Sequence, residues 1–145
     1  MQHMFKALIL TFILIGFNVK AADDLMTFDF DVVVERGYAE GILDKNIHFI
    51  LKGNRNPAID KNFGEFSTNK KTNGFGKSDK KSCDWALLSA LKQLQERAQS
   101  LNADYVINII SNYKSKQYED SEQYQCGVGF LMSGVALKAD IVRAE

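Results

Sequence analysis

The sequence predicts an α+β fold in which one main amphipathic helix packs on a small, mostly antiparallel sheet, with one disulfide. Three observations indicate this fold. Leucines recur at helical spacing within residues 79–101, and shorter segments with alternating apolar residues lie on both sides of that helix. The third observation is an even pair of cysteines, Cys83 and Cys126, in a chain that starts with the pattern of a secretory leader.

Residues 1–21 have the three-part pattern of a signal peptide, with a positively charged start, an apolar run over 7–17 and a small-residue cleavage site. Val19 and Ala21 fit the −3 and −1 positions of that site, so we expect the cut after Ala21. The apolar run is shorter than the roughly 20 residues that cross a bilayer, and an uncleaved membrane anchor is the alternative. We expect residues 22–145 to form a single soluble periplasmic domain with no stable membrane anchor.

The segment that precedes the main helix contains shorter predicted elements. Residues 23–43 combine strand-like alternation with helical spacing, which favours a short strand or extended lead-in followed by a short helix. Residues 46–52 alternate as a strand does, and 53–57 have the composition of a turn. A further strand with a polar end is predicted over 64–72, and a glycine-containing loop over 73–77.

The main helix is predicted over residues 79–101. Ser78 is placed to cap its first turn, and Asn102 suits the left-handed conformation that ends many helices. One face of the helix is apolar and is expected to lie on the sheet, while the opposite face is charged and polar. The apolar stripe consists of Leu87, Leu91, Leu94, Ala98 and Leu101.

Two strands are predicted after the helix. Residues 105–112 are an apolar run typical of a buried strand, and 114–121 form a polar connection. Residues 122–139 are predicted as one long strand in which the apolar positions change from even to odd numbers. Such a one-residue slip predicts a β-bulge at Ser133-Gly134.

Cys83 and Cys126 are predicted to form a disulfide. Cys83 shares a helix face with the leucine stripe, so its sulfur points toward apolar surface. Cys126 does the same on a predicted strand face, whose other members are Tyr124, Val128, Phe130 and Met132. Closing this loop would stabilise the fold by roughly 4 kcal/mol in the chain-entropy model. The alternative is a metal site, for which the two thiols and His48 supply three soft ligands.

The charge balance and the motifs argue against several functions. Basic and acidic residues number 18 each, which gives no support for a nucleic-acid binder. Gly76-Lys77-Ser78 matches the end of a phosphate-binding P-loop, but Lys71 stands where the motif requires glycine. A hydrolase would have to use His48, and nothing places a nucleophile beside it. We therefore predict no catalytic residues, no cofactor and no metal.

One loop has the composition of a contact surface. Residues 69–81 are rich in lysine, with Lys70, Lys71 and Lys77 near Phe75. An aromatic side chain among cations suits an anionic partner, such as lipid head groups or an acidic protein face. The alternative is a solvated lysine loop with Phe75 folded back onto the core.

Several segments within residues 63–138 resemble a family of small exported proteobacterial proteins that are automatically named "excinuclease ATPase subunit". The chain does not support that name, because its sequence contains no Walker motifs, ABC signature or zinc-binding cysteine set. The resembling segments are 68–73, 77–78, Cys83-Asp84-Trp85-Ala86, 94–98, 108–109, Ser111-Asn112-Tyr113-Lys114, Cys126 and 132–138.

A second resemblance is at the level of the fold. Residues 98–108, where a helix end runs into a strand, are similar to the corresponding turn of YbjQ-type domains and of the envelope-stress lipoprotein RcsF. The Gly134-Val135-Ala136 strand suits the same comparison. RcsF is also held by disulfides, but this chain has neither its lipid-anchor cysteine nor a second disulfide. The resemblance implies a role in envelope sensing or interaction, although a fold does not determine a function.

These observations favour a non-enzymatic periplasmic domain that binds a protein or a component of the cell envelope, with Lys70, Lys71, Phe75 and Lys77 as the contact residues. A small-ligand or metal-binding module of the YbjQ type is the second hypothesis, and reactive free thiols would favour it. The third is a cryptic hydrolase, for which a deep polar pocket around His48 would be the supporting observation.

Overall fold

The structure is a computed structural model that describes residues 23–145. The predicted signal peptide therefore lies outside the described residues. Across residues 23–145, none of the helices has both the length and the apolar character that a membrane crossing requires.

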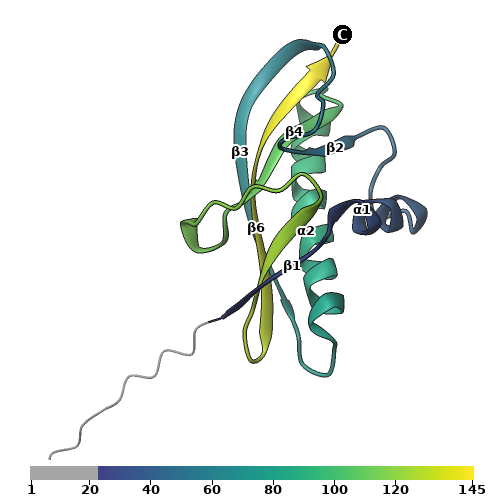
Figure 1. Cartoon of the computed structure of the whole chain (residues 1–145). Helices are drawn as coiled ribbons and strands as arrows, with labels where there is room; N and C mark the ends of the chain where they lie inside the picture. The colour runs from purple at the N-terminus through teal and green to yellow at the C-terminus, as the bar shows by residue number, and fades with distance from the viewer. Residues whose placement is uncertain (1–22) are drawn as a thin grey trace, which may run out of the picture.

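The described chain is an α+β fold with two α-helices and six strands (Figure 1). Strand β1 leads directly into the short helix α1, and strands β2 and β3 precede the long helix α2. Three strands follow that helix, with a short 3-10 turn, η1, after the first of them. The elements are β1 (Asp24–Asp29), α1 (Phe30–Ala39), β2 (His48–Leu51), β3 (Ile59–Asn73), α2 (Asp79–Ser100), β4 (Tyr105–Ser111), η1 (Tyr113–Ser115), β5 (Gln123–Val128) and β6 (Met132–Ala144).

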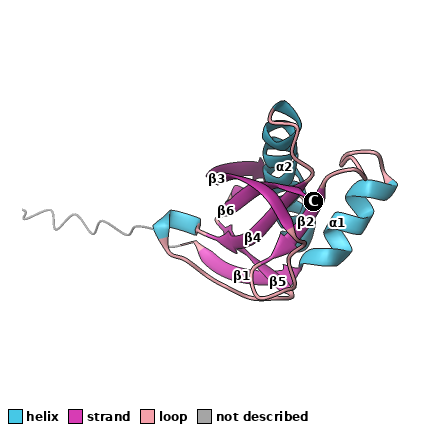
Figure 2. Ribbon diagram, turned by 90° about the horizontal axis from the view of Figure 1, so that it is seen from above, coloured by secondary structure: helices cyan, strands magenta, loops and turns pink. Residues whose placement is uncertain are grey.

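Strand β6 is the centre of a curled, mostly antiparallel sheet (Figure 2). Along one edge it pairs with β3 from Met132 to Ala144. Along the other edge, its first residues pair with β5 and its later residues pair with β4. The sheet therefore divides, with β1 continuing from β5 and β2 continuing from β4. Only the β2–β4 pairing is parallel.

Helix α2 covers the sheet with the predicted stripe. Leu87, Leu91 and Leu94 are almost completely buried, and they belong to the same core as Val135, Leu137 and Ile141 of β6. The Ser78 side chain caps the helix by accepting a hydrogen bond from the Lys81 backbone N–H at 3.2 Å. Asn102, just past the helix, has φ of 53°, so its left-handed conformation is confirmed.

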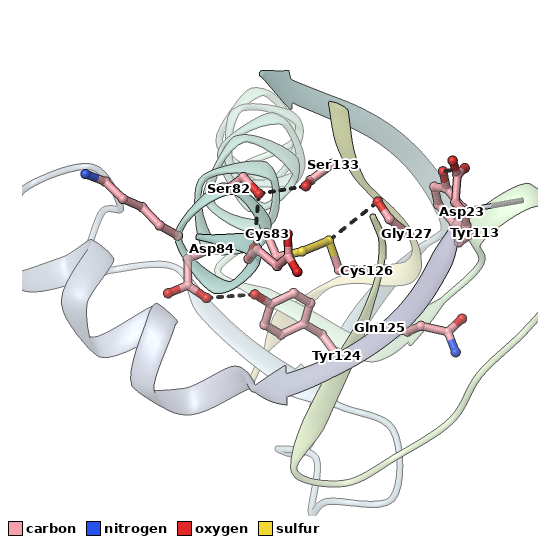
Figure 3. The surroundings of a disulfide bond; sticks show 12 residues. Asp23, Ser82, Cys83, Asp84, Tyr113, Tyr124, Gln125, Cys126, Gly127 and Ser133 are labelled. Carbon is pink, nitrogen blue, oxygen red and sulfur yellow. Dashed lines mark hydrogen bonds between the residues drawn. A yellow bond between two sulfur atoms is a disulfide. The ribbon is translucent and has the colours of Figure 1, made fainter. Parts of the chain in front are cut away.

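The predicted disulfide is present. Cys83, in the first third of α2, is bonded to Cys126 of β5 with an S–S distance of 2.03 Å, and both residues are fully buried (Figure 3). Both cysteines of the chain are thus in this bond, which leaves no thiol for the alternative metal site. The bond fixes one end of the helix to the part of the sheet that β1 and β5 form.

The prediction of one long strand over residues 122–139 is wrong. The chain reverses direction after Val128, and strands β5 and β6 form a hairpin. The change of parity thus marks a turn at residues 129–131, and Ser133 and Gly134 are regularly paired with Val128 and Gly127. Of the predicted strand face, Tyr124, Cys126 and Val128 do lie toward the core on β5, but Phe130 lies in the turn and Met132 on β6. Since Phe130 and Leu131 are apolar, the turn lacks the polar residues that would distinguish its sequence from that of a strand.

Strand β3 is longer than the predicted 64–72, because it begins at Ile59. Its pairing with β6 shifts in register between Asn62 and Glu65, where Gly64 has φ of 99°. The pairings of β2 with β4 and of β4 with β6 also shift in register, so the irregularities of the described sheet lie away from Ser133-Gly134. Before Gly64 the strand has polar residues on both faces, so its sequence lacks the alternation of apolar and polar residues that predicts a strand.

Candidate binding surface

Two loops meet at the end of the molecule opposite the C-terminus (Figure 1). One is the predicted 73–77 loop between β3 and α2, and the other is the turn of the β5–β6 hairpin. The Gly74 backbone N–H donates a hydrogen bond of 2.7 Å to the carbonyl of Leu131. Asn73 pairs with Met132 at the adjoining end of the two strands. The loops are therefore joined through their backbones.

The joined loops carry four exposed apolar side chains, which we call the apolar tip: Phe75, Phe130, Leu131 and Met132. Phe130 is 95% exposed and Phe75 is 75% exposed. Leu131 and Met132 are about half exposed. Single exposed apolar residues are ordinary, whereas four of them on two joined loops form a candidate contact surface.

Lysines adjoin the apolar tip. Lys71 pairs with Gly134 and lines the same shallow hollow as Phe130, Leu131 and Met132. The Lys77 ammonium donates to the Asn73 carbonyl at 3.1 Å, which holds it at the strand end that pairs with Met132. Among the ion pairs of the described residues, none involves Lys71 or Lys77.

The structure brings three of the four predicted contact residues together. Phe75, Lys71 and Lys77 lie at the tip, and Phe75 is exposed instead of being folded onto the core. Lys70 is half-buried and lines a hollow with Lys92 and Glu96 of α2, along the flank of the molecule. Phe130 and Leu131 were missed by the sequence analysis, because the predicted long strand placed them inside the sheet.

Tyr113 forms the base of the tip. Its ring packs over Gly127 and Gly134, which face each other across β5 and β6. A Cβ added at Gly127 would lie 2.1 Å from Cζ of Tyr113, so only glycine fits below the ring. The Tyr113 hydroxyl donates a 2.5 Å hydrogen bond to the Asp23 carboxylate, to which the Lys114 ammonium also binds at 2.9 Å.

These contacts determine the charges at the base of the tip. The hydrogen bond from Tyr113, followed by that from Lys114, lowers the pKa of Asp23 below its ordinary value, so its carboxylate is ionised. Burial, and then the hydrogen bond to Asp23, raises the pKa of Tyr113 to about 12. At neutral pH the tyrosine is therefore a neutral donor to a fixed anion.

Behind the tip, buried polar contacts attach α2 to the sheet (Figure 3). The Oγ atoms of Ser82 and Ser133 are 2.6 Å apart, and Ser82 also donates to the Asp79 carbonyl at 3.0 Å. Because a carbonyl only accepts, the Ser82 proton goes to Asp79 and Ser133 donates to Ser82. The next residue, Cys83, forms the disulfide with Cys126, so the part of the fold behind the tip is covalently cross-linked.

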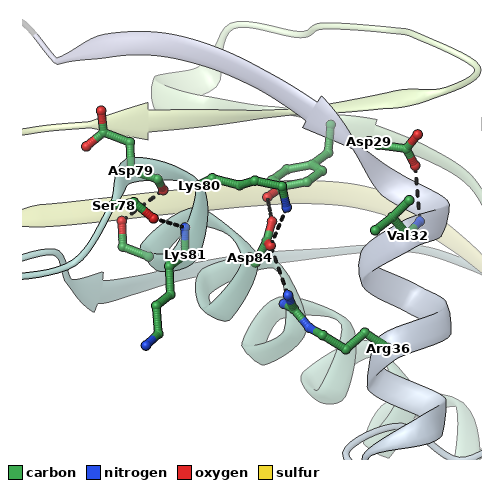
Figure 4. Close-up of polar contacts among 10 residues, drawn as sticks. Asp29, Val32, Arg36, Ser78, Asp79, Lys80, Lys81 and Asp84 are labelled. Carbon is green, nitrogen blue, oxygen red and sulfur yellow. Dashed lines mark hydrogen bonds and ion pairs between the residues drawn. The ribbon is translucent and has the colours of Figure 1, made fainter.

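A second polar cluster surrounds the buried carboxylate of Asp84 (Figure 4). It accepts hydrogen bonds from the Tyr124 hydroxyl at 2.8 Å, from Lys80 at 2.6 Å and from Arg36 at 3.2 Å. Burial raises the pKa of Tyr124, so its hydroxyl stays a donor. These partners compensate the buried charge, and we interpret the cluster as a structural joint between α1, α2 and β5.

Asp84 was also missed by the sequence analysis, although the sequence contains a signal for it. Asp84 lies three residues before Leu87 and seven before Leu91, which places a carboxylate on the apolar stripe of the helix. A charge in that position needs partners when the helix packs. Its partners come from α1 and β5, which are distant in sequence.

The predicted alternatives gain no support from the described residues. His48 is exposed on β2, where its ring lies 4.7 Å from the ring of Tyr105. Within residues 23–145, no group of three or more histidine, cysteine or acidic side chains is arranged to hold a metal ion. No protein-family model matches the chain, and no curated protein matches it significantly.

Proposed function

We propose that the chain is an exported, non-enzymatic domain that binds a protein or another component of the cell envelope through the apolar tip. The observation that carries this proposal is the exposure of Phe130, Leu131 and Met132 beside Lys71, with Phe75 and Lys77 on the loop that is hydrogen-bonded to the same turn. Exposing these side chains to water is unfavourable, and a partner that covers them recovers that free energy.

The contacts that hold the tip in place support a binding role. The turn is attached to the 73–77 loop by the Gly74–Leu131 hydrogen bond, and the disulfide and the Ser82–Ser133 contact lie directly behind it. A contact surface that is already ordered loses little conformational entropy on binding. The tip is therefore suited to recognition without rearrangement.

The disulfide supports an oxidising compartment. Such bonds persist outside the cytosol, and the leader pattern of residues 1–21 predicts export. The periplasm is the compartment that we propose on these grounds. A role in envelope sensing, which the resemblance to RcsF implies, is one form that this binding function would take.

Photo-crosslinking in living cells tests the proposal. A photoactivatable amino acid placed at Phe130 or Phe75 should give covalent adducts with an envelope protein or lipid, identified by mass spectrometry. The matched control is Val32, which is also apolar and 55% exposed but lies on α1. Equal labelling from all three positions, or labelling from Val32 alone, would show that the tip is not the contact surface.

A further inference from the structure

We infer that the partner of the apolar tip is the surface of a membrane that contains anionic lipids. This inference rests on the proposed function and names the chemistry of its partner. The tip residues Phe75, Phe130 and Leu131 would enter the head-group and upper acyl region, while Lys71 and Lys77 would contact lipid phosphates.

The tip is small and lies at the end of the molecule. Complete burial of its four side chains would cover on the order of 500 Å². A stable protein–protein interface buries roughly 800 Å² on each partner, so a protein partner would need contacts beyond the four side chains of the tip. Insertion into a bilayer interface needs no matching surface, and a few aromatic and aliphatic side chains are sufficient for reversible binding.

The charges at this end are arranged as a lipid surface requires. Apolar side chains occupy the turn, and Lys71 and Lys77 lie one step behind them on β3 and on the adjoining loop. Lys81, in the first turn of α2, lines a separate hollow with Arg36 and Glu40. Long lysine side chains reach phosphates while their stems stay among apolar groups. Each lysine near an anionic membrane adds measurably to binding.

The acids at this end do not cancel these lysines. Asp23 is paired with Lys114 and lies in the same hollow as Lys71, and Asp84 is paired with Lys80 and Arg36. Asp24 and Asp79 are exposed and carry the remaining negative charge. Cleavage after Ala21 would add a new α-amino group one residue before Asp23. The end that carries the tip therefore has a local excess of positive charge on a chain that is nearly neutral as a whole.

Asp23 connects the tip to the predicted leader. Asp23 lies in the same hollow as Phe130 and Leu131. The apolar run of the leader ends at Phe17. The six peptide units from Phe17 to Asp23 span at most about 20 Å. The tip therefore lies close along the chain to the segment that we expect to enter the membrane.

Vesicle flotation tests the inference with the processed protein purified after export. Phosphatidylcholine vesicles with about one third phosphatidylglycerol should bind the protein, and pure phosphatidylcholine should bind at least tenfold less. Phe130→Ser should weaken binding to the anionic vesicles about tenfold, because one inserted aromatic is lost. The double variant Lys71→Gln/Lys77→Gln should weaken it by more than tenfold and reduce its dependence on salt.

Matched variants control for nonspecific effects. Val32→Ser removes an equally accessible apolar residue from α1, and Lys45→Gln removes an exposed lysine from the loop after it. Both should bind as the unmodified protein does. All of these variants change exposed side chains, so thermal unfolding should show that they fold.

A second measurement reports insertion directly. In the variant Phe130→Trp/Trp85→Phe, the new tryptophan should shift its emission to the blue and be quenched by brominated lipid chains. Absence of binding, or binding unchanged by Phe130→Ser, would overturn the lipid inference. If photo-crosslinks from Phe130 in cells then lead to a protein, the proposed function holds and only its lipid partner is wrong. If they lead to neither protein nor lipid, both proposals are wrong.

Discussion

At the scale of single residues, Tyr113 determines how the tip is supported. Its ring occupies the space that two facing glycines leave open, and its hydroxyl binds the ionised Asp23. Neither glycine has a positive φ, so the tyrosine ring, and not the backbone conformation, requires them. This requirement links the connection after β4 with β5 and β6.

Gly127→Ala should therefore destabilise the fold. Its Cβ would overlap the Tyr113 ring, and the ring or the strands must move, at a cost of about 1–3 kcal/mol in the free energy of unfolding. Urea denaturation measures this change. Gly74→Ala is the control, since its Cβ would meet only ordinary contacts at 3.6 Å or more, and the change there should stay within about 0.5 kcal/mol. Equal effects of the two variants would contradict this account.

The sequence contained part of this residue-scale information. The cysteine pair, the Ser78 cap and the left-handed Asn102 were all predictable, because each depends on neighbours in sequence or on a well-known pairing. The Tyr113–Gly127 contact and the partners of Asp84 were not predictable. They join segments that are distant in the chain, and a single sequence records no such proximity.

At the scale of elements, the sequence specified helix α2 and the strands β2 and β4 well, because their apolar spacing is regular, whereas the mixed spacing of residues 23–43 gave only the order of β1 and α1. The prediction for the β5–β6 hairpin was wrong for a physical reason. A bulge and a tight turn both shift the alternation of a strand, and they are separated mainly by the turn residues. Here the turn contains Phe130 and Leu131, which are apolar like strand residues. These two members of the tip are therefore the reason why the turn was not predicted.

The disulfide is the strongest connection between elements, because it joins α2 to β5 across a sequence separation of 43 residues. The double variant Cys83→Ala/Cys126→Ala should lower the free energy of unfolding by about 2–5 kcal/mol. Denaturation of both proteins without reductant measures the difference, and the unmodified protein under reductant provides the control. An unchanged denaturation midpoint would show that packing alone fixes the helix to β5.

At the scale of the whole molecule, the export of the chain gives a prediction that is independent of the tip. Mass spectrometry of the periplasmic protein should show an N-terminus at Ala22 and no alkylation before reduction, with both cysteines alkylated after reduction. Retention of residues 1–21 would instead support the membrane-anchor alternative. Free thiols would contradict the oxidised state on which the compartment argument depends.

The direction of β6 has a practical consequence for handling the protein. This strand begins beside the tip at Met132 and ends near the C-terminus at Ala144, a path of about 40 Å. A fluorescent label or affinity handle fused after Glu145 would therefore stay clear of any bound surface. The same fusion placed before Asp23 would crowd Phe130 and obscure the interaction that it was meant to report.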